Sequence, residues 1–241
     1  MNFIHPEANI NDNAYISDLV SIGKGVAIEH DVYISKGAII YGNALIKKGT
    51  FIGENCIIGH PQRAELKKII EKKDSTLNLR NPLVEIKQDC TIRAGSIIYS
   101  EVIMGENCQT GHHVMIREKT TIGKNTLIGT NTVIDGNVII GENVSIQTGV
   151  YIPLFSKIGN HVFMGPFSKL TNDKYMMRKK FELIGPTLED YVSVGANSVI
   201  LPGIKLKKNS IVGAGSVVTK DVEENQVVVG NPAKPIKRFI E

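Results

Sequence analysis

The chain has 241 residues, a net charge of +4, no Trp and only 6% aromatic residues, whereas 42% of its residues are hydrophobic. It contains 34 Ile and 23 Gly. So many β-branched aliphatic residues exclude a disordered chain. A helical bundle is also disfavoured, because Ile and Gly are both poor helix formers. No apolar run approaches the ~20 residues of a membrane span, and no basic region followed by an apolar stretch opens the chain. We therefore expect a cytoplasmic protein without a membrane span, and the charge is too small to indicate nucleic-acid binding.

A six-residue period runs through most of the chain. Every sixth residue is Ile over residues 4–58, and the same lattice continues with aliphatic residues over 86–170, where Thr110 is the polar exception, and over 188–218. The fourth residue after each lattice position is usually small or β-branched, and Gly often follows the lattice residue, for example at Gly123. We expect these glycines to turn corners with a positive φ.

This period fits a short strand and a turn, with three such hexapeptides closing one triangular coil. Stacked coils place parallel strands about 4.8 Å apart, so about ten coils form a prism roughly 50 Å long. The repeat resembles that of the hexapeptide-repeat proteins, which fold as left-handed parallel β-helices; the handedness is implied by this resemblance. The prediction is an all-β fold: a left-handed β-helix domain over residues 1–222, with two extended loops, and a C-terminal cap over 223–241.

The lattice fails at about residues 60–83 and again at about 171–187. The first break includes AELKKIIEKK, which predicts an amphipathic helix with Leu66, Ile69 and Ile70 on one side. Loops that leave a regular solenoid commonly carry function, although they also serve to cover neighbouring subunits.

The C-terminal segment, VVTKDV followed by GNPAK, resembles the ending of hexapeptide-repeat acyltransferases that use acetyl-CoA. The resemblance implies that this end of the prism binds the cofactor, with lysines near its phosphates and small corners that admit its pantetheine amides. A cap over the exposed strand edge is the alternative, and the two are compatible. The expected cofactor-binding residues are Gly165, Gly195, Ala196, Gly213, Ala214, Thr219, Lys220, Lys234 and Arg238.

The stretch GPFSKLTNDKY resembles a segment of the nucleotide-sugar N-acetyltransferases that act on amino sugars for surface glycan synthesis. Asn172, Asp173, Lys174 and Tyr175 match that motif, whereas Met176 replaces the usual Pro. We expect these four residues, with His60 at the first loop, to bind substrate, and Asn172 and Asp173 to take part in catalysis. An Asx turn that starts the loop is the alternative role for Asn172 and Asp173.

His112 and His113 lie at a corner and are candidates for a general base, since imidazole titrates near neutral pH. Packing against a subunit neighbour is the alternative. Because the spacing from His112 to Asn172 is three coils plus one further hexapeptide, they lie on different corners of one chain, and two chains of a homotrimer would be needed to bring them together. No metal is expected, because no suitable second or third ligand accompanies His112. Cys90 and Cys108, which are one full coil apart, predict stacked buried thiols, with a disulfide as the alternative.

Together these features predict an acetyl-CoA-dependent N-acetyltransferase for a UDP- or dTDP-linked amino sugar. Its expected mechanism is direct attack of the sugar amine on the thioester, with positioning supplying much of the rate. The alternatives are an O-acyltransferase that acts on a sugar or a small hydroxy compound, and a non-catalytic β-helix scaffold.

Overall fold

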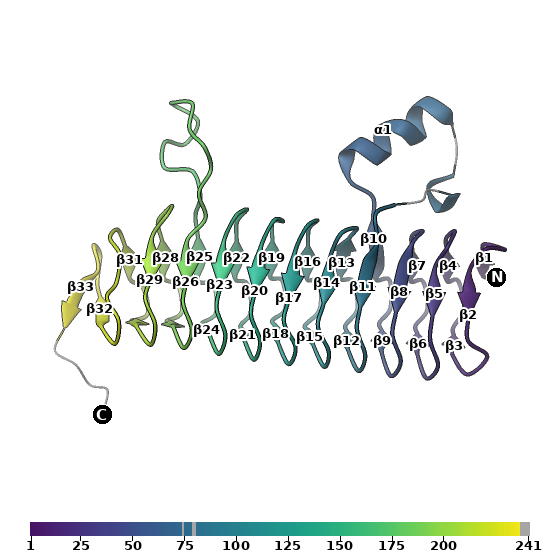
Figure 1. The fold of residues 1–241 in the computed structure, drawn as a ribbon, viewed down its shortest axis with the longest axis horizontal. Coiled ribbons are helices and arrows are strands. Elements are labelled where there is room, and N and C mark those ends of the chain that lie inside the picture. Colours follow the sequence, from purple (N-terminus) through teal and green to yellow (C-terminus); the bar gives the residue numbers. More distant parts are fainter. Residues whose placement is uncertain (74, 79–80, 237–241) are drawn as a thin grey trace.

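The computed structural model describes residues 1–73, 75–78 and 81–236, and these form a triangular prism with one parallel sheet on each side (Figure 1). Within the described residues the three sheets contain 11, 10 and 12 strands. The left-handed β-helix is thus confirmed, and the expected number of about ten coils is slightly too low. Among the described residues, the structure has no helix that is long and apolar enough to cross a bilayer.

Sheet A occupies the first side of the prism. Its strands, in spatial order, are β1 (Phe3–Ile4), β4 (Ser21–Ile22), β7 (Ile39–Ile40), β10 (Ile57–His60), β13 (Ile97–Tyr99), β16 (Met115–Ile116), β19 (Val133–Ile134), β22 (Tyr151–Ile152), β25 (Lys169–Leu170), β28 (Val199–Ile200) and β31 (Val217–Val218).

Sheet B follows sheet A in each coil. Its strands are β2 (Asn9–Ile10), β5 (Ala27–Ile28), β8 (Ala44–Ile46), β11 (Val84–Ile86), β14 (Ile103–Met104), β17 (Thr121–Ile122), β20 (Ile139–Ile140), β23 (Lys157–Ile158), β26 (Thr187–Leu188) and β29 (Lys205–Leu206).

Sheet C closes each coil. Its strands are β3 (Tyr15–Ile16), β6 (Tyr33–Ile34), β9 (Phe51–Ile52), β12 (Thr91–Ile92), β15 (Gln109–Thr110), β18 (Leu127–Ile128), β21 (Ser145–Ile146), β24 (Phe163–Met164), β27 (Ser193–Val194), β30 (Ile211–Val212), β32 (Val227–Val229) and β33 (Lys234–Ile236). The strand β33 runs antiparallel to β32 at the C-terminal end of the prism.

The register of the strands explains the period of the sequence. Residues 18 apart pair directly, as Ile116 does with Ile134, so that each lattice residue stacks on its equivalent in the next coil. From residue 22 to residue 218 the lattice side chains are almost completely buried, and with the small residues four positions later they form one aliphatic core. Thr110 is also buried, and its hydroxyl accepts a hydrogen bond of 3.0 Å from the backbone N–H of Arg93.

The corner glycines serve a different purpose from the one expected. Gly123, like most glycines that directly follow a lattice residue, does not have a positive φ. A Cβ on Gly123 would lie 2.6 Å from the backbone carbonyl carbon of Gly141 in the next coil, so these positions are Gly because adjacent corners approach closely. The left-handed conformation occurs two residues later, for example at Asn125 with a φ of 57°. Asn tolerates this conformation better than most residues.

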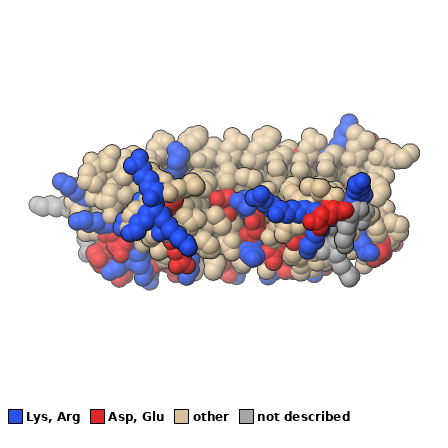
Figure 2. Space-filling view, turned by 90° about the horizontal axis from the view of Figure 1, so that it is seen from above, with Lys and Arg blue, Asp and Glu red and all other residues tan. Residues whose placement is uncertain are grey.

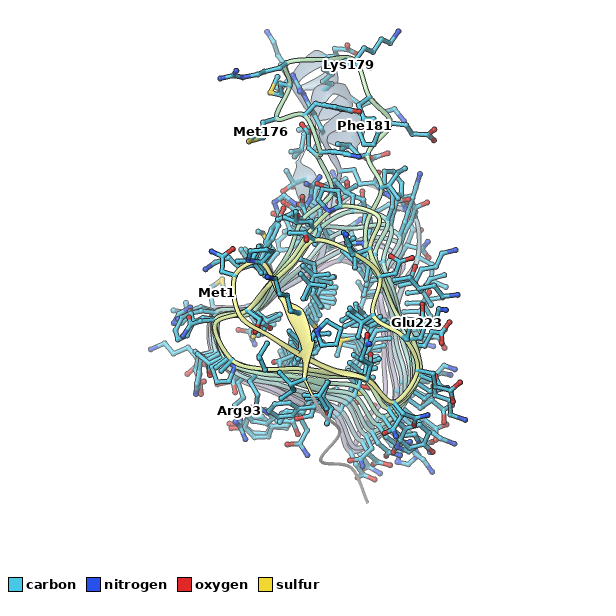
Figure 3. All side chains as sticks on the ribbon, turned by 90° about the vertical axis from the view of Figure 1, so that its left-hand side faces the viewer. Met1, Arg93, Met176, Lys179, Phe181 and Glu223 are labelled. Atoms are coloured by element: carbon cyan, nitrogen blue, oxygen red, sulfur yellow. The ribbon has the colours of Figure 1, made fainter. Side chains whose placement is uncertain are left out.

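Both interruptions leave the prism at the edge between sheets A and B, which we call the A–B edge (Figure 1). Loop 1, residues 61–83, contains α1 (Arg63–Lys72) and the 3₁₀ helix η1 (Thr76–Asn78). The predicted helix is confirmed, and Leu66 and Ile69 are half-buried. Ile70, which the helix geometry places on the same side, is nevertheless 76% exposed. Loop 2, residues 171–186, projects beyond the prism with Met176, Lys179 and Phe181 near its tip (Figure 3).

Candidate functional site

The expected site residues fall on two edges of the prism. The corners that join sheet C to sheet A, which we call the C–A edge, carry His112, His113, Gly165, Gly195, Ala196, Gly213 and Ala214. The A–B edge carries His60, Asn172, Asp173, Lys174, Tyr175, Thr219 and Lys220. Sheet A separates the two edges in a single chain, in agreement with the different corners predicted for His112 and Asn172.

The small corners on the C–A edge are packed against one another. A Cβ on Gly165 would lie 2.6 Å from the backbone nitrogen of Ala196, and one on Gly195 would lie 2.4 Å from that of Ala214. Coil stacking by itself therefore accounts for Gly at both positions, and their role toward a cofactor remains a prediction. Lys234 is exposed in β33, and Arg238 lies outside the described residues.

His112 and His113 are exposed on the same edge. The backbone N–H of His112 donates to the Thr130 hydroxyl at 3.2 Å, and His113 has a left-handed φ of 54°. Among the described residues, no hydrogen bond joins either imidazole ring to another side chain, and the His113 ring packs over Gly95, where a Cβ would lie 2.4 Å from its Nδ1. Their catalytic role remains a prediction.

Asp173 organises loop 2 from within. Its carboxylate accepts hydrogen bonds from the backbone N–H groups of Tyr175, Met176 and Met177 at 2.8, 2.9 and 3.0 Å. The base of the loop is closed by the backbone N–H of Ile184, which donates to the carbonyl of Asn172 at 3.1 Å. Both carboxylate oxygens of Asp173 are thus occupied, which favours the Asx-turn alternative for this residue.

Tyr175 packs inside the loop as well. Its ring meets Phe181 edge-on, with 5.1 Å between the centroids, and the ammonium of Lys179 lies 5.1 Å from the centre of the Tyr175 ring. These contacts give Tyr175 a structural role in this conformation of the loop.

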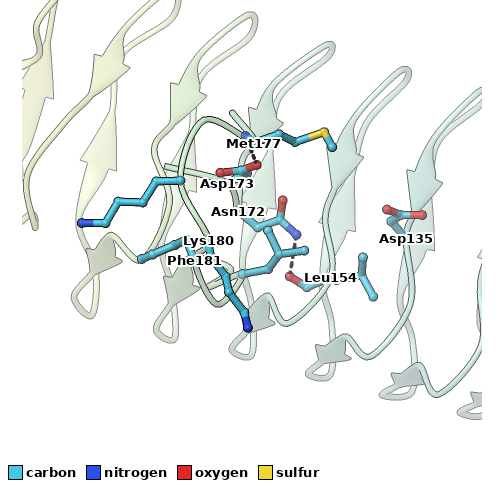
Figure 4. A pocket seen from close by; sticks show the side chains of 9 residues that line it. Asp135, Leu154, Asn172, Asp173, Met177, Lys180 and Phe181 are labelled. Carbon is cyan, nitrogen blue, oxygen red and sulfur yellow. Dashed lines mark hydrogen bonds between the residues drawn. The ribbon is translucent and has the colours of Figure 1, made fainter. Parts of the chain in front are cut away.

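Loop 2 stands between two surface pockets. The first, of about 690 Å³, is lined by carboxylates, lysines and apolar side chains, and we call it the lysine pocket (Figure 4). Its lining residues are Asp135, Leu154, Asn172, Asp173, Met177, Lys179, Lys180, Phe181 and Leu183. The Asn172 amide donates to the Leu154 carbonyl at 3.4 Å at the floor of this pocket.

The second pocket, of about 390 Å³, lies on the C-terminal side of loop 2 and is mainly apolar; we call it the apolar pocket. It is lined by Thr171, Asp173, Lys174, Met176, Leu201, Pro202, Ile204 and Thr219. Lys174, expected to bind substrate, and Thr219, expected to bind the cofactor, therefore meet in one pocket.

His60 does not join this group. It lies at the root of loop 1, five coils from the root of loop 2, or roughly 24 Å at the usual strand spacing. Its ring packs against Tyr99 and Tyr41 with centroid distances of 4.6 and 5.9 Å, and its Nδ1 lies 2.9 Å from the Pro61 carbonyl.

The sequence did not single out a polar cluster on the A–B edge between the two loops. Arg117 pairs with Asp135 at 2.8 Å and with Glu118 at 2.9 Å, and the Tyr151 hydroxyl donates to Asp135 at 3.3 Å. The available signal was an Arg and an Asp one full coil apart, at corners of the edge from which both loops leave.

Two further predictions concern the cysteines and possible metal ligands. Cys56, Cys90 and Cys108 are free and buried, so the predicted buried thiols are confirmed and the disulfide alternative is not. Burial raises the pKa of Cys56 to about 11. Among the described residues, no group of three or more His, Cys, Asp or Glu side chains is placed to hold a metal ion.

Two protein families match parts of the sequence. The family described as the GMPPB C-terminal domain matches residues 1–79, and the bacterial transferase hexapeptide family, with six repeats, matches residues 119–153 and 185–220. The hexapeptide repeat predicted from the sequence is thus confirmed by a family model over two segments of the chain.

Curated relatives of this hexapeptide-repeat protein include acetyltransferases. It is 36% identical over 89 residues to the galactoside O-acetyltransferase of Lactococcus lactis, and this alignment covers 34% of this chain and 42% of the relative. It is 58% identical over 50 residues to the 2,3,4,5-tetrahydropyridine-2,6-dicarboxylate N-acetyltransferase of Clostridium perfringens, and this alignment covers 21% of each chain. The matches thus span less than half the length of these relatives.

Among solved structures, a UDP-N-acetylglucosamine acyltransferase from Bacteroides fragilis is 20% identical. The alignment covers 98% of this protein and 72% of that chain, with a TM-score of 0.44.

Proposed function

We propose that this hexapeptide-repeat protein transfers the acetyl group of acetyl-CoA to the amine of a UDP- or dTDP-linked amino sugar. The observation that carries the proposal is loop 2, which presents four basic side chains against two carboxylates and stands between the lysine pocket and the apolar pocket. Figure 2, which looks down on the A–B edge, shows Lys and Arg gathered where this loop projects. A diphosphate suits such a basic loop, and an apolar pocket suits the arm of the donor.

The matched relatives support acetyl transfer as the reaction class. One is named for an O-acetyl acceptor and the other for an N-acetyl acceptor, so the relatives leave the acceptor atom open. The resemblance of residues 165–175 to nucleotide-sugar N-acetyltransferases favours an amine and a role in surface glycan synthesis. The galactoside O-acetyltransferase favours transfer to a sugar hydroxyl as the second candidate.

Residues of the chain suit acetyl-CoA as the co-substrate. Lys174 and Thr219 border the apolar pocket, and Lys220 is exposed at the same corner as Thr219. These side chains would hold the polar parts of the donor, which supplies the thioester. The sugar amine would attack the thioester carbonyl, forming a C–N bond while the C–S bond breaks and CoA leaves as the thiol, with a net loss of one proton from the ammonium form.

We also propose that the protein assembles as a homotrimer in the cytoplasm. The outer face of sheet A carries a column of half-buried apolar side chains that includes Ile39, Ile57, Ile97, Met115 and Val133. A second copy packed on this face would bring its C–A edge, with His112, toward the loops on the A–B edge of the first. Light scattering should give about three times the chain mass of 26.4 kDa. Val133→Lys should reduce the measured mass to that of a single chain.

Two measurements test the proposed reaction. Acetyl-CoA should raise the melting temperature of the protein, whereas a scaffold would show no stabilisation. A panel of UDP- and dTDP-amino sugars should then release CoA thiol with at least one member. Thiol release only with hydroxyl acceptors would favour the second candidate, and no release with any acceptor would refute both.

A further inference from the structure

Two side chains on the neighbouring coils, Arg117 and Tyr151, hold the carboxylate of Asp135 in one orientation. Arg117 Nη1 donates to Oδ1 of Asp135 at 2.8 Å, and the Tyr151 hydroxyl donates to Oδ2 at 3.3 Å. Arg117 is shared with Glu118, to which its Nε and Nη2 donate at 3.2 and 2.9 Å. One guanidinium therefore faces two carboxylates, and the cluster retains one net negative charge.

The pKa values of the two donors keep them in the required form. Although burial by itself would lower it, the hydrogen bonds that Arg117 donates to the carboxylates of Asp135 and Glu118 raise the pKa of Arg117. Burial, followed by the neighbouring Asp135 carboxylate, raises the pKa of Tyr151. The phenol thus remains a hydrogen-bond donor at neutral pH.

Asp135 is the member of this cluster that reaches the lysine pocket. Arg117, Glu118 and Tyr151 do not line the pocket, whereas Asp135 does. Asp135 and Asn172 belong to corners two coils apart, roughly 10 Å, with Leu154 on the coil between them (Figure 4). This distance leaves space for one sugar ring above Leu154.

The two ends of the lysine pocket differ in net charge. Asp135 lies at one end, while Lys179, Lys180 and Asp173 line the pocket from loop 2, where the two ammonium groups outnumber the one carboxylate. A ligand that matches this arrangement carries a cation at one end and an anion at the other. An amino sugar joined to a diphosphate has this character, whereas a neutral sugar diphosphate would leave the carboxylate without a cation.

We infer that Asp135 binds the protonated amine of the acceptor and thereby selects amino sugars over their hydroxyl counterparts. This inference rests on the proposed function and narrows its substrate class. The ammonium contributes N–H donors and a positive charge to the carboxylate, whereas a hydroxyl contributes one neutral donor. Before attack the ammonium must lose one proton to solvent, and the second proton lost by the nitrogen leaves with the CoA thiol, so that the net release is one proton. Arg117 and Tyr151 act as positioning residues.

The test measures binding of the acceptor without the donor. UDP- and dTDP-sugars with an amine at carbon 2, 3 or 4 are each paired with the nucleotide sugar that has a hydroxyl at the same carbon. Titration calorimetry gives the ratio of the two dissociation constants. For the preferred pair we expect the wild-type protein to favour the amine roughly tenfold to hundredfold, the range of a charge-assisted hydrogen bond.

Variants assign this preference to one carboxylate. Asp135→Asn should bring the ratio close to one without weakening the hydroxyl partner, and Asp135→Glu should retain part of the preference. Glu118→Gln is the matched control, because Glu118 accepts from the same Arg117 but does not line the pocket, and its ratio should remain that of the wild type.

Several outcomes would overturn the inference. A wild-type protein without preference for any amine, a preference that survives Asp135→Asn, or an equal loss in Glu118→Gln would each do so. Failure of the proposed function gives a different result, namely tight and selective binding of an amino sugar without release of CoA thiol.

Discussion

Replacing Asp173 by Ala distinguishes a residue that organises loop 2 from one that contacts substrate. The substitution removes three hydrogen bonds that backbone N–H groups donate to the carboxylate, at 2.8, 2.9 and 3.0 Å. Because Asp173 is half-exposed, each bond should contribute about 1 kcal/mol, the typical net value for an intramolecular hydrogen bond, and the three together about 3 kcal/mol. The open form of the loop should then become about 100-fold more populated.

Limited trypsin digestion measures this opening, since the loop contains Lys174, Arg178, Lys179 and Lys180. When opening and closing are fast relative to cleavage, the cleavage rate follows the population of the open form, and it should rise by about the same factor. The melting temperature of the prism should change little, because loop 2 lies outside the core.

Glu182→Ala provides the control, because it removes the same charge from an exposed position of the same loop. It should leave the cleavage rate within a few-fold of the wild type. If Asp173→Ala leaves cleavage unchanged but raises the KM for the acceptor, Asp173 contacts substrate and the structural reasoning is wrong.

The remaining predictions concern stability and the buried thiols. Ile140→Ala should lower the free energy of unfolding by about 2–5 kcal/mol in chemical denaturation, whereas Ile139→Ala, at an adjacent position 57% exposed, should cost less than about 1 kcal/mol; equal losses would refute the assignment of faces. Asn125→Ala should cost about 1–2 kcal/mol, since it loses side-chain hydrogen bonds to the equivalent Asn of both neighbouring coils at an unfavourable φ, and Asn125→Gly should recover part of that loss. With a pKa of about 11, Cys56 should be about 0.1% thiolate at pH 8 and should react with Ellman's reagent only after denaturation; rapid labelling of the native protein would contradict its burial.

The six-residue pattern was sufficient to predict the prism, because the interior of the prism is the only place where the lattice side chains can all be buried. A period of six with aliphatic residues specifies that strands one full coil apart pair in direct register, and Ile116 pairs with Ile134 as that period requires. The reason for the corner glycines was not accessible in the same way. Their closeness to the next coil depends on the stacking distance between corners, which no single hexapeptide shows.

Within the site, the sequence located loop 2 but not its internal contacts. The matching motif includes Asp173, but the three backbone N–H groups that donate to its carboxylate depend on the conformation of the loop, which the motif does not specify. The cluster of Arg117, Asp135 and Tyr151 was missed for a related reason. These residues occupy polar positions outside the aliphatic lattice, and they meet because residues 16–18 apart lie on adjacent coils.

The three-hexapeptide coil also restricts how this protein can change in length. Both loops leave the same edge because a whole number of coils, five, separates their roots. Removing one whole coil between them would shorten the gap by about 4.8 Å and keep both loops on that edge. Removing one or two hexapeptides would instead rotate loop 2 to another edge of the prism. Only insertions and deletions of whole coils between the loops therefore keep both loops on one edge.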